Sequence, residues 1–303
     1  MLKKRKAILI VGGTGFIGYH LAIFCKNKNL KVTVISSNSP PKKRFIRGVK
    51  YLKCNISKKI NFRALKNCNF NYVVNLGGYV DHKNKVKTHL SHFIGVKNLA
   101  DFFLSKKIDT FVQMSTGGEY GNQKSPHKER QRCKPNSVYS RAKYLATNYL
   151  LRLFKKNKFP CIILRLYQAY GPGQDVNRFL PTLITNCIKN STFKTSHGKQ
   201  YRDFIYINDL ILVIYKCLKT KSARGEILNV GSGKPLNIKK IIYKSIKLCK
   251  GGKPKFGEIA LRKEENLITY PSLIKIKKIL SWKPMVNFDK GFKITVNSYK
   301  KLV

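Results

Sequence analysis

Tyr139 and Lys143 stand four residues apart, and they are the first side chains in the sequence whose spacing could move a proton. Residues four apart on an α-helix project from the same face, one turn from each other. A tyrosine in water ionises at about pH 10, and a neighbouring ammonium group favours the phenolate, which brings its pKa toward useful acid and base chemistry. Because the chain has 16 tyrosines, this spacing also arises by chance. The pair therefore predicts catalysis only together with further motifs.

A glycine-rich turn near the start of the chain is such a motif. In GGTGFIG, Gly12, Gly15 and Gly18 recur at every third position between an apolar run (6–11) and an amphipathic stretch (19–29). This order predicts a strand, a tight turn and a helix. Without side chains, backbone amides and the helix N-terminus can approach a pyrophosphate closely. We therefore expect a dinucleotide site here rather than an ordinary tight turn.

The residues after the second predicted strand (31–36) bear on which dinucleotide is bound. A carboxylate usually ends this strand where the ribose carries a free hydroxyl, and the sequence has none there. Ser36, Ser37 and Asn38 could hydrogen-bond a ribose phosphate, and the basic residues 42–44 (KKR) could neutralise it. The pattern favours NADP over NAD as the cofactor. The alternative is that these basic residues belong to a solvated loop.

Strands and helices that alternate along the chain must position these motifs. Apolar runs predict buried strands, and helical periodicity predicts the helices between them, including one that carries Tyr139 and begins at Asn136 or Ser137. The predicted strands are 6–11, 31–36, 50–54, 71–76, 111–115 and 161–167, and the clearest helices are 89–106 and 136–157. Such alternation predicts an α/β fold whose parallel sheet is wrapped on both faces and binds ligands at the carboxyl ends of its strands.

After Gly171 the alternation becomes less regular, which indicates a second part of the molecule. We expect a Rossmann-type, doubly wound core over residues 1–167, to which residues 201–220 return. The remaining residues, 168–200 and 221–303, are expected to form a smaller C-terminal substrate lobe.

Lysine and arginine dominate the charged residues. The chain has 62 of them against 13 aspartates and glutamates, a net charge of +49, which could attract nucleic acid, an anionic membrane or phosphorylated substrates. The lysines are spread from end to end with no aromatic platform among them, so a basic solvated surface is the preferred interpretation and a nucleic-acid partner is disfavoured. No stretch reaches about 18 uncharged apolar residues, and no signal-peptide pattern is present, so we expect a cytoplasmic protein without a membrane span. Eight cysteines without CxxC or metal-ligand spacing predict free thiols and no metal site.

The order of the motifs resembles one family. A glycine turn, Ser115 and Thr116 at the end of a strand, and YxxxK on the next helix are similar to the extended short-chain dehydrogenase/reductase family of nucleotide-sugar epimerases, dehydratases and ketoreductases. Further similar segments extend over nearly the whole chain: VVNLGG (73–78), GVKNLADF (95–102), ILRLYQAYGPGQ (163–174), RDFIYINDL (202–210), NVGSGKPLNI (229–238) and LSWKP (280–284). The resemblance implies a nucleotide-diphosphate sugar as substrate and a homodimer formed through helices that include 136–157.

The resemblance also implies roles for individual residues. Tyr139 would be the general acid and base, Lys143 would tune it and hold the nicotinamide ribose, and Thr116 would bond the reacting sugar oxygen. Besides Tyr139 and Lys143, the implied cofactor contacts are Gly12, Gly15, Phe16, Ile17, Gly18, Ser36, Ser37, Asn55, Ile56, Leu76, Gly77 and Gly78. The implied substrate contacts are Ser115, Gln168, Arg178, Arg202 and Arg262.

Some polar residues depart from the family pattern or have no implied role. Asn55 stands where the family usually has Asp, and Gln168 where it usually has Asn, which puts both contacts in doubt. Asp203 and Asp209 are expected to be structural, and Glu119 is expected to bond backbone amides or a nearby lysine rather than substrate. His82 and His92 receive no catalytic role.

Two glycines narrow the chemistry that the resemblance implies. Dehydratases of the family carry Asp and Glu directly after the hydroxyl residue to remove water across sugar carbons 5 and 6, and this chain has Gly117 and Gly118 there. A dehydratase is therefore disfavoured, and a 4-epimerase and an NADPH-consuming 4-ketoreductase both stay open. The EYG ending (119–121) and the loop 195–209 are similar to deoxysugar enzymes of surface-polysaccharide pathways. A non-catalytic member that binds RNA or acts as a scaffold is the rival class, which the retained motifs disfavour.

Overall fold

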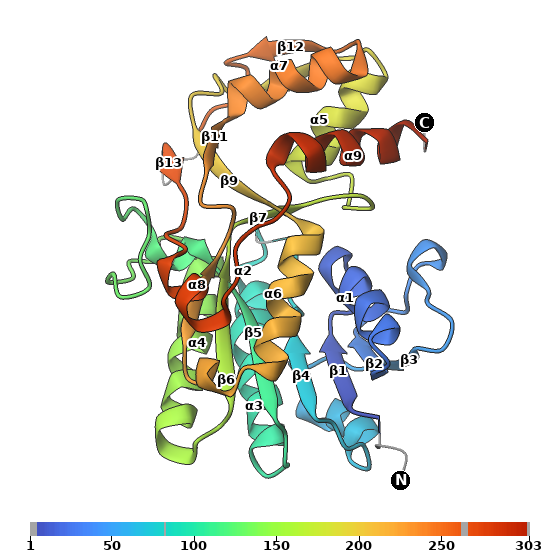
Figure 1. Ribbon diagram of the computed structural model, residues 1–303, viewed down its shortest axis with the longest axis vertical. Helices are drawn as coiled ribbons and strands as arrows, with labels where there is room; N and C mark the ends of the chain where they lie inside the picture. The colour runs from blue at the N-terminus through green and yellow to red at the C-terminus, as the bar shows by residue number, and fades with distance from the viewer. Residues whose placement is uncertain (1–4, 82, 262–265, 302–303) are drawn as a thin grey trace.

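A parallel sheet forms the centre of the computed structural model, which describes residues 5–81, 83–261 and 266–301. Within these residues the sheet has seven strands in the order β10-β6-β5-β4-β1-β2-β3, all parallel (Figure 1). The strands are β1 (Ala7–Val11), β2 (Lys31–Ser36), β3 (Lys50–Lys53), β4 (Tyr72–Asn75), β5 (Thr110–Thr116), β6 (Cys161–Leu166) and β10 (Ile227–Val230). This architecture confirms the predicted Rossmann-type α/β fold.

Both faces of the sheet are buried, which explains the uninterrupted apolar runs of its strands. In β1, Ile8 and Ile10 belong to one hydrophobic cluster, whereas Leu9 and Val11 belong to another. Successive side chains of a strand point to opposite faces, so each cluster lies on its own side of the sheet. A sheet of this kind needs helices on both sides.

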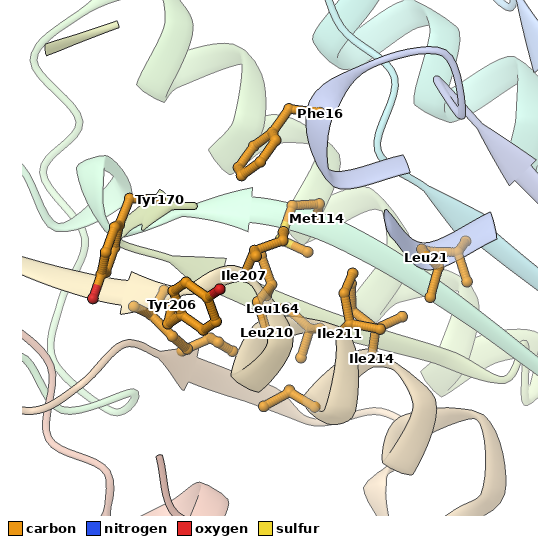
Figure 2. Packing of buried hydrophobic residues seen from close by; sticks show 14 of the residues in the cluster. Phe16, Leu21, Met114, Leu164, Tyr170, Tyr206, Ile207, Leu210, Ile211 and Ile214 are labelled. Atoms are coloured by element: carbon orange, nitrogen blue, oxygen red, sulfur yellow. The ribbon is translucent and has the colours of Figure 1, made fainter. Parts of the chain in front are cut away.

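Helices from two parts of the chain cover the first face. They are α1 (Phe16–Asn27) and α6 (Ile207–Lys219). Figure 2 shows Ile207, Leu210, Ile211 and Ile214 of α6 beside Met114 and Leu164 of the sheet. Their spacing of three, one and three residues gives α6 one continuous apolar stripe. The helix α6 thus packs on the central sheet.

The second face is covered by α3 (Gly95–Leu104) and α4 (Val138–Asn157). The predicted helix 89–106 is part of a longer helical run, in which α2 (Lys85–His89) and a π-helical turn, η3 (Leu90–Ile94), precede α3. A π-helical turn inserts an extra residue into a helix and is often found at functional sites.

A smaller lobe lies beyond the carboxyl ends of the central strands (Figure 1). Its described strands form a four-stranded sheet of β7 (Gln168–Tyr170), β9 (Tyr201–Tyr206), β11 (Pro235–Asn237) and β13 (Ile268–Thr269), and a pair of β8 (Thr192–Thr195) and β12 (Lys253–Phe256). Its helices include α5 (Phe179–Ile188), α7 (Ile238–Cys249) and α9 (Phe288–Lys300). Among the described residues, no helix is long and apolar enough to span a membrane.

Two strands, β9 and β10, each join a different sheet from the one that we expected from the sequence. β10 was assigned to the substrate lobe, but it pairs with β6 and forms an edge of the central sheet. β9 was assigned to the core, but it pairs with β7, β11 and β13. The helix α8 (Ile274–Leu280) follows β13 and packs beside β10. Because short apolar strands carry no signal for which sheet they join, only the pairing settles these positions.

Candidate active site

The glycine turn lies between β1 and α1 and packs directly against the end of β4. Gly12 has a φ of +74°, and a Cβ atom there would lie 2.9 Å from the backbone of Gly77. A Cβ at Gly18 would lie 2.4 Å from the Cα of Gly13. Glycine is thus required at both positions. Gly15 precedes the first turn of α1 and has no side chain to cap its amides, so the N-terminus of α1 can accept an anion.

Residues at the ends of β3 and β4 lie beside this turn. A Cβ at Gly77 would lie 3.7 Å from the side chain of Ile56, and one at Gly78 would overlap the ring of His92. The side-chain oxygen of Asn55 accepts hydrogen bonds from the backbone and hydroxyl of Ser57, at 3.0 and 2.8 Å. That oxygen is engaged in a local turn, so a contact from Asn55 to the cofactor would come from its amide nitrogen.

The residues predicted to bind a ribose phosphate at the end of β2 differ in their contacts and exposure. Ser36 hydrogen-bonds the hydroxyl of Thr14 at 2.9 Å, and both residues line a small pocket together with Asn38 and Lys53. Ser37 is exposed at this end of the strand. The turn and the end of β2 thus form one continuous surface.

Arg44 differs from its predicted role. It is buried, and its guanidinium donates to the carbonyl oxygens of Thr14 and Gly173, at 3.3 and 2.8 Å, and to the carboxylate of Asp175 at 2.8 Å. These three contacts commit it to joining the glycine turn to the loop after β7. Only Lys42 and Lys43 of the basic run stay exposed.

Tyr139 and Lys143 occupy the start of α4 and face β5. Ser137 caps the helix: its hydroxyl accepts from the backbone of Ser140 at 3.1 Å, and the Ser140 hydroxyl accepts from the backbone of Ser137 at 3.0 Å. The Nζ of Lys143 donates to the carbonyl oxygen of Met114 at 2.7 Å and lies 5.9 Å from the centroid of the Tyr139 ring. The structure thus brings the predicted pair to the end of the strand that carries Thr116.

Burial controls how the two groups ionise. It raises the pKa of Tyr139 to about 12, although the Thr116 side chain and the charge of Arg178 act in the opposite direction. It lowers the pKa of Lys143 to about 8, against the influence of the Glu119 carboxylate. We expected the ammonium to lower the pKa of the phenol, and this was wrong for the protein without ligands. Loss of solvation outweighs nearby charges here.

Ser115 and Glu119 form a buried cluster beneath the site. Ser115, expected to contact substrate, is 3% exposed, and its hydroxyl donates to Glu119 instead. The Glu119 carboxylate also accepts from Thr147 at 2.7 Å and from Nε and Nη2 of Arg165 at 2.9 and 2.7 Å. Glu119 is thus buried and bonded within the protein, and its partners are an arginine and hydroxyls rather than the amides or lysine that we expected.

The residues predicted to bind substrate lie on several different elements. Arg178 precedes α5, is exposed, and lies close enough for its charge to lower the pKa of Tyr139. Gln168 is exposed at the start of β7. In β9, Nη1 of Arg202 donates to the carbonyl oxygen of Tyr201 at 2.8 Å. Arg262, like His82, lies outside the described residues.

Two aromatic residues near the site were not assigned from the sequence. The ring of His92, on the π-helical turn, meets the Tyr139 ring edge-on at 4.8 Å between centroids. The ring of Tyr167 covers Gly117, where a Cβ would lie 2.7 Å from its Cζ atom, and its hydroxyl lies 2.6 Å from Nδ1 of His127. Neither contact has a sequence signal, because the partners come from elements that are far apart in the sequence.

Asp203 and Asp209, which we expected to be structural, bind backbone amides of distant segments. Asp203 is buried and accepts from the backbone and hydroxyl of Ser232, at 2.6 and 2.9 Å, and from the backbone of Lys234 at 3.1 Å. Asp209 accepts from the backbone of Met285 and Val286, at 3.1 and 2.9 Å. Both carboxylates thus secure loops that return to the site.

Comparison with known proteins places the chain in a family. The sequence model of the NAD dependent epimerase/dehydratase family matches residues 8–231, which is most of the chain. The chain belongs to this family. The matched residues include the glycine turn, the end of β5 and the Tyr139–Lys143 pair.

Relatives within the NAD-dependent epimerase/dehydratase family carry more than one activity. The chain is 28% identical to a putative UDP-glucose 4-epimerase from Methanocaldococcus jannaschii, over 97% of this chain and 98% of that protein. It is 29% identical to the dTDP-D-glucose 4,6-dehydratase of Dictyostelium discoideum, over 74% of this chain and 58% of that protein. The UDP-glucose 4-epimerase of Thermotoga maritima, solved with UDP-glucose, has the same fold, with a TM-score of 0.92, 22% identity, and coverage of 98% and 99% of the two chains.

The buried carboxyl group of Asp203 leads to a pH-dependence that can be measured. Burial raises its pKa to about 6, while hydrogen bonds from Ser232 and Lys234 act in the opposite direction. The folded protein thus holds this proton more tightly than the unfolded chain, whose aspartates titrate at about 3.9. The stabilisation is complete below that pH and is lost as pH rises through about 6. We expect Asp203→Asn to lack this decline, which is about 2–3 kcal/mol in the wild type.

Urea unfolding between about pH 4 and pH 7 measures this difference. Asp109→Asn is the matched control, because Asp109 is exposed and pairs with Lys6 at the surface. The control is expected to keep the wild-type slope. Parallel curves for Asp203→Asn and the wild type would show that Asp203 does not hold its proton as proposed.

Proposed function

We propose that this protein is an NAD-dependent nucleotide-sugar 4-epimerase. The observation that carries the proposal is the arrangement of Tyr139, Lys143 and Thr116 at the end of β5, beside the open N-terminus of α1. Such an arrangement places a proton carrier next to the expected position of a nicotinamide ring. The full-length similarity to a putative UDP-glucose 4-epimerase supports the same reaction.

The residues around the glycine turn fit a dinucleotide. Backbone amides at Gly15 and Phe16 would hold the pyrophosphate, and the surface from Thr14 to Ser36 would hold the adenosine ribose. NAD would supply the hydride acceptor at sugar carbon 4 and return the hydride to the opposite face. Because Arg44 is committed to Asp175 and the loop after β7, we propose NAD rather than the NADP favoured by the basic run.

Tyr139 and its neighbours would manage the proton of the sugar hydroxyl. The phenol oxygen of Tyr139 would take the proton from the carbon 4 hydroxyl during oxidation and return it during reduction. Thr116 would hydrogen-bond the same oxygen and hold the sugar against the phenol. Lys143 is fixed by the Met114 carbonyl and would keep a positive charge one turn from the phenol. Lys143 is buried and Tyr139 is partly exposed, so a bound sugar would cover the phenol and strengthen these interactions by excluding water.

Arginines would bind the diphosphate of the substrate. Arg178 lies near Tyr139, and Arg202 lies in the lobe that faces the sheet. A guanidinium binds phosphate oxygens in pairs and keeps its charge, so it suits a nucleotide diphosphate. Arg262 stays a prediction from the resemblance.

Gly117 and Tyr167 argue against a dehydratase. The Tyr167 ring fills the space beside Gly117 that a side chain would occupy. Gly118 is exposed and brings no acid or base. Removal of water from a keto sugar needs proton carriers, which these two positions do not provide. The similarity to a dehydratase therefore reflects the shared carbon 4 step.

A 4-ketoreductase is the second candidate, and the ionisation of Tyr139 favours it. A phenol with a pKa of about 12 holds its proton and is ready to donate it to a carbonyl oxygen as hydride arrives. A role in surface-polysaccharide sugars and a cytoplasmic location stay predictions from the sequence.

Apolar side chains on the second face of the core support a homodimer. Val86 on α2 is 68% exposed, and Leu90 on η3 and Leu145 on α4 are each 40% exposed. These elements pack against one another, so the three side chains belong to one helical surface. We propose that a second copy of the chain covers this surface, since exposed apolar side chains that gather on one surface often mark an interface.

Replacement of Tyr139 tests the mechanism. We expect Tyr139→Phe to lower kcat by about 10²- to 10⁴-fold, because the proton carrier is lost while the ring still packs. Tyr144→Phe, on the same helix, is the matched control and should keep wild-type turnover. The assay follows interconversion of carbon 4 epimers of UDP-hexoses and the dinucleotide retained on purification.

Each outcome of this assay decides between the candidates. Retained NAD with no net consumption supports the epimerase, and stoichiometric loss of NADPH with 4-keto sugars supports the ketoreductase. Full activity of Tyr139→Phe would overturn both. Salt-sensitive binding to RNA without turnover would favour the non-catalytic class.

A charge placed on the helical surface tests the dimer. We expect Leu145→Glu to convert a dimer into a monomer, because a buried unpaired carboxylate opposes association. Light scattering measures the mass in solution. Ile274→Glu, on the exposed side of α8, is the control and should stay dimeric. A wild-type monomer, or a dimeric Leu145→Glu, would contradict the proposed interface.

A further inference from the structure

Glu119 and Arg165 form a buried ion pair directly beneath the proposed site. Their side chains are 0% and 2% exposed, and the carboxylate accepts from two nitrogens of the guanidinium. The ring of Tyr120 packs on the guanidinium, with 4.6 Å between Cζ and the ring centroid. The pair takes no part in the proton transfer described above.

The Glu119 carboxylate joins three elements that carry the site. It accepts from Ser115, the residue before Thr116 on β5, and from Thr147, one helical turn after Lys143 on α4. Arg165 lies on β6, two residues before Tyr167, whose ring covers Gly117. Each partner is therefore close in sequence to a residue of the proposed site.

Stability alone does not account for this pair. Removal of two charges from water costs several kcal/mol per ion, and replacing a buried ion pair by apolar residues is often neutral or stabilising. Apolar residues at both positions 119 and 165 would fill the space with less cost. What apolar residues cannot supply is a set of directed bonds to three separate elements.

We propose that Glu119 is a positioning residue, which fixes the end of β5 against α4 and β6 so that Thr116, Tyr139 and Lys143 keep their relative places. This inference rests on the proposed function of those three residues. Glu119 acts through Ser115, Thr147 and Arg165 and does not itself reach the sugar.

The negative charge of Glu119 also affects how Tyr139 and Lys143 ionise. Its carboxylate raises the pKa of Lys143 and adds to the raised pKa of Tyr139. Other groups that face the phenol include Thr116 from β5, Arg178 at the start of α5, His92 from η3 and Lys143 on its own helix. Removal of the carboxylate is therefore expected to move both titrations to lower pH.

Two variants separate positioning from stabilisation. Glu119→Gln alone leaves the buried Arg165 unpaired and is expected to unfold easily. The double variant Glu119→Gln/Arg165→Met removes both charges and keeps a carbonyl oxygen that can accept from Ser115 and Thr147. Thr147→Val removes the bond to α4 with little change in shape, and Thr295→Val is its matched control, since Thr295 is also buried on a helix, α9.

Melting temperature, kcat and KM are measured across pH for each variant. We expect the double variant to melt near the wild type while its kcat profile moves toward acid by about one pH unit. Thr147→Val should lose about tenfold in kcat with KM nearly unchanged, because the sugar binds but the phenol is misplaced. Thr295→Val should match the wild type in kcat and pH profile.

Wild-type kcat and pH profile in the double variant and in Thr147→Val would overturn the inference and leave Glu119 as a stabilising residue only. A readout without substrate separates this result from failure of the proposed function. The pH-dependence of Lys143 acetylation, followed by peptide mass spectrometry, should shift to lower pH in the double variant. If it shifts while no sugar nucleotide is turned over, the inference stands and the proposed activity fails. An unshifted Lys143 would contradict the inference.

Discussion

The common direction of the central strands is the constraint on which the site depends. Because every strand pairs in parallel with its neighbours, the chain leaves each strand at the same edge of the sheet. Gly12 after β1, Gly77 after β4 and Thr116 at the end of β5 therefore lie along one line, although they are far apart in sequence. The close approach of Gly12 to Gly77 leaves that edge flat enough for a dinucleotide. A side chain at either glycine would separate the glycine turn from the end of β4.

Loss of solvation at the proposed site changes the pKa values of Tyr139 and Lys143. It raises the pKa of the phenol to about 12 and lowers the pKa of the ammonium to about 8, so the phenol holds its proton firmly while Lys143 stays mostly charged at neutral pH. The pair is therefore prepared to donate a proton from Tyr139 before it is prepared to accept one. Positive charge brought close to the phenol favours the phenolate, and Arg178 already acts in that sense. In the proposed carbon 4 reaction, what binds beside Tyr139 would therefore decide how readily the phenol accepts a proton.

The sequence predicted best those features that depend on local spacing. The strand, turn and helix around Gly12, and the shared face of Tyr139 and Lys143, follow from periods of two and 3.6 residues. The contacts that were missed or assigned wrongly mostly join distant segments: Arg44 with Asp175, Glu119 with Arg165, and the Tyr167 ring over Gly117. A basic residue in a lysine-rich chain carries no signal that it will be buried. The sheet joined by β10 was unpredictable for the same reason, since a short run of three apolar residues and Asn229 suits any buried strand.

The loop after β7 couples the two parts of the molecule. Arg44 holds the carbonyl of Gly173 from the core, Nε2 of His20 on α1 lies 3.0 Å from the carbonyl of Pro172, and the Tyr299 hydroxyl of α9 donates to the carbonyl of Gln174. A carbonyl can only accept, so the His20 nitrogen must carry a proton. Three elements thus fix one short loop through its backbone, whatever its side chains. Since that loop leads into Arg178 and α5, the same bonds that join it to the glycine turn also help to position the arginine near Tyr139, and they would hold the proposed cofactor and substrate sides of the site in register.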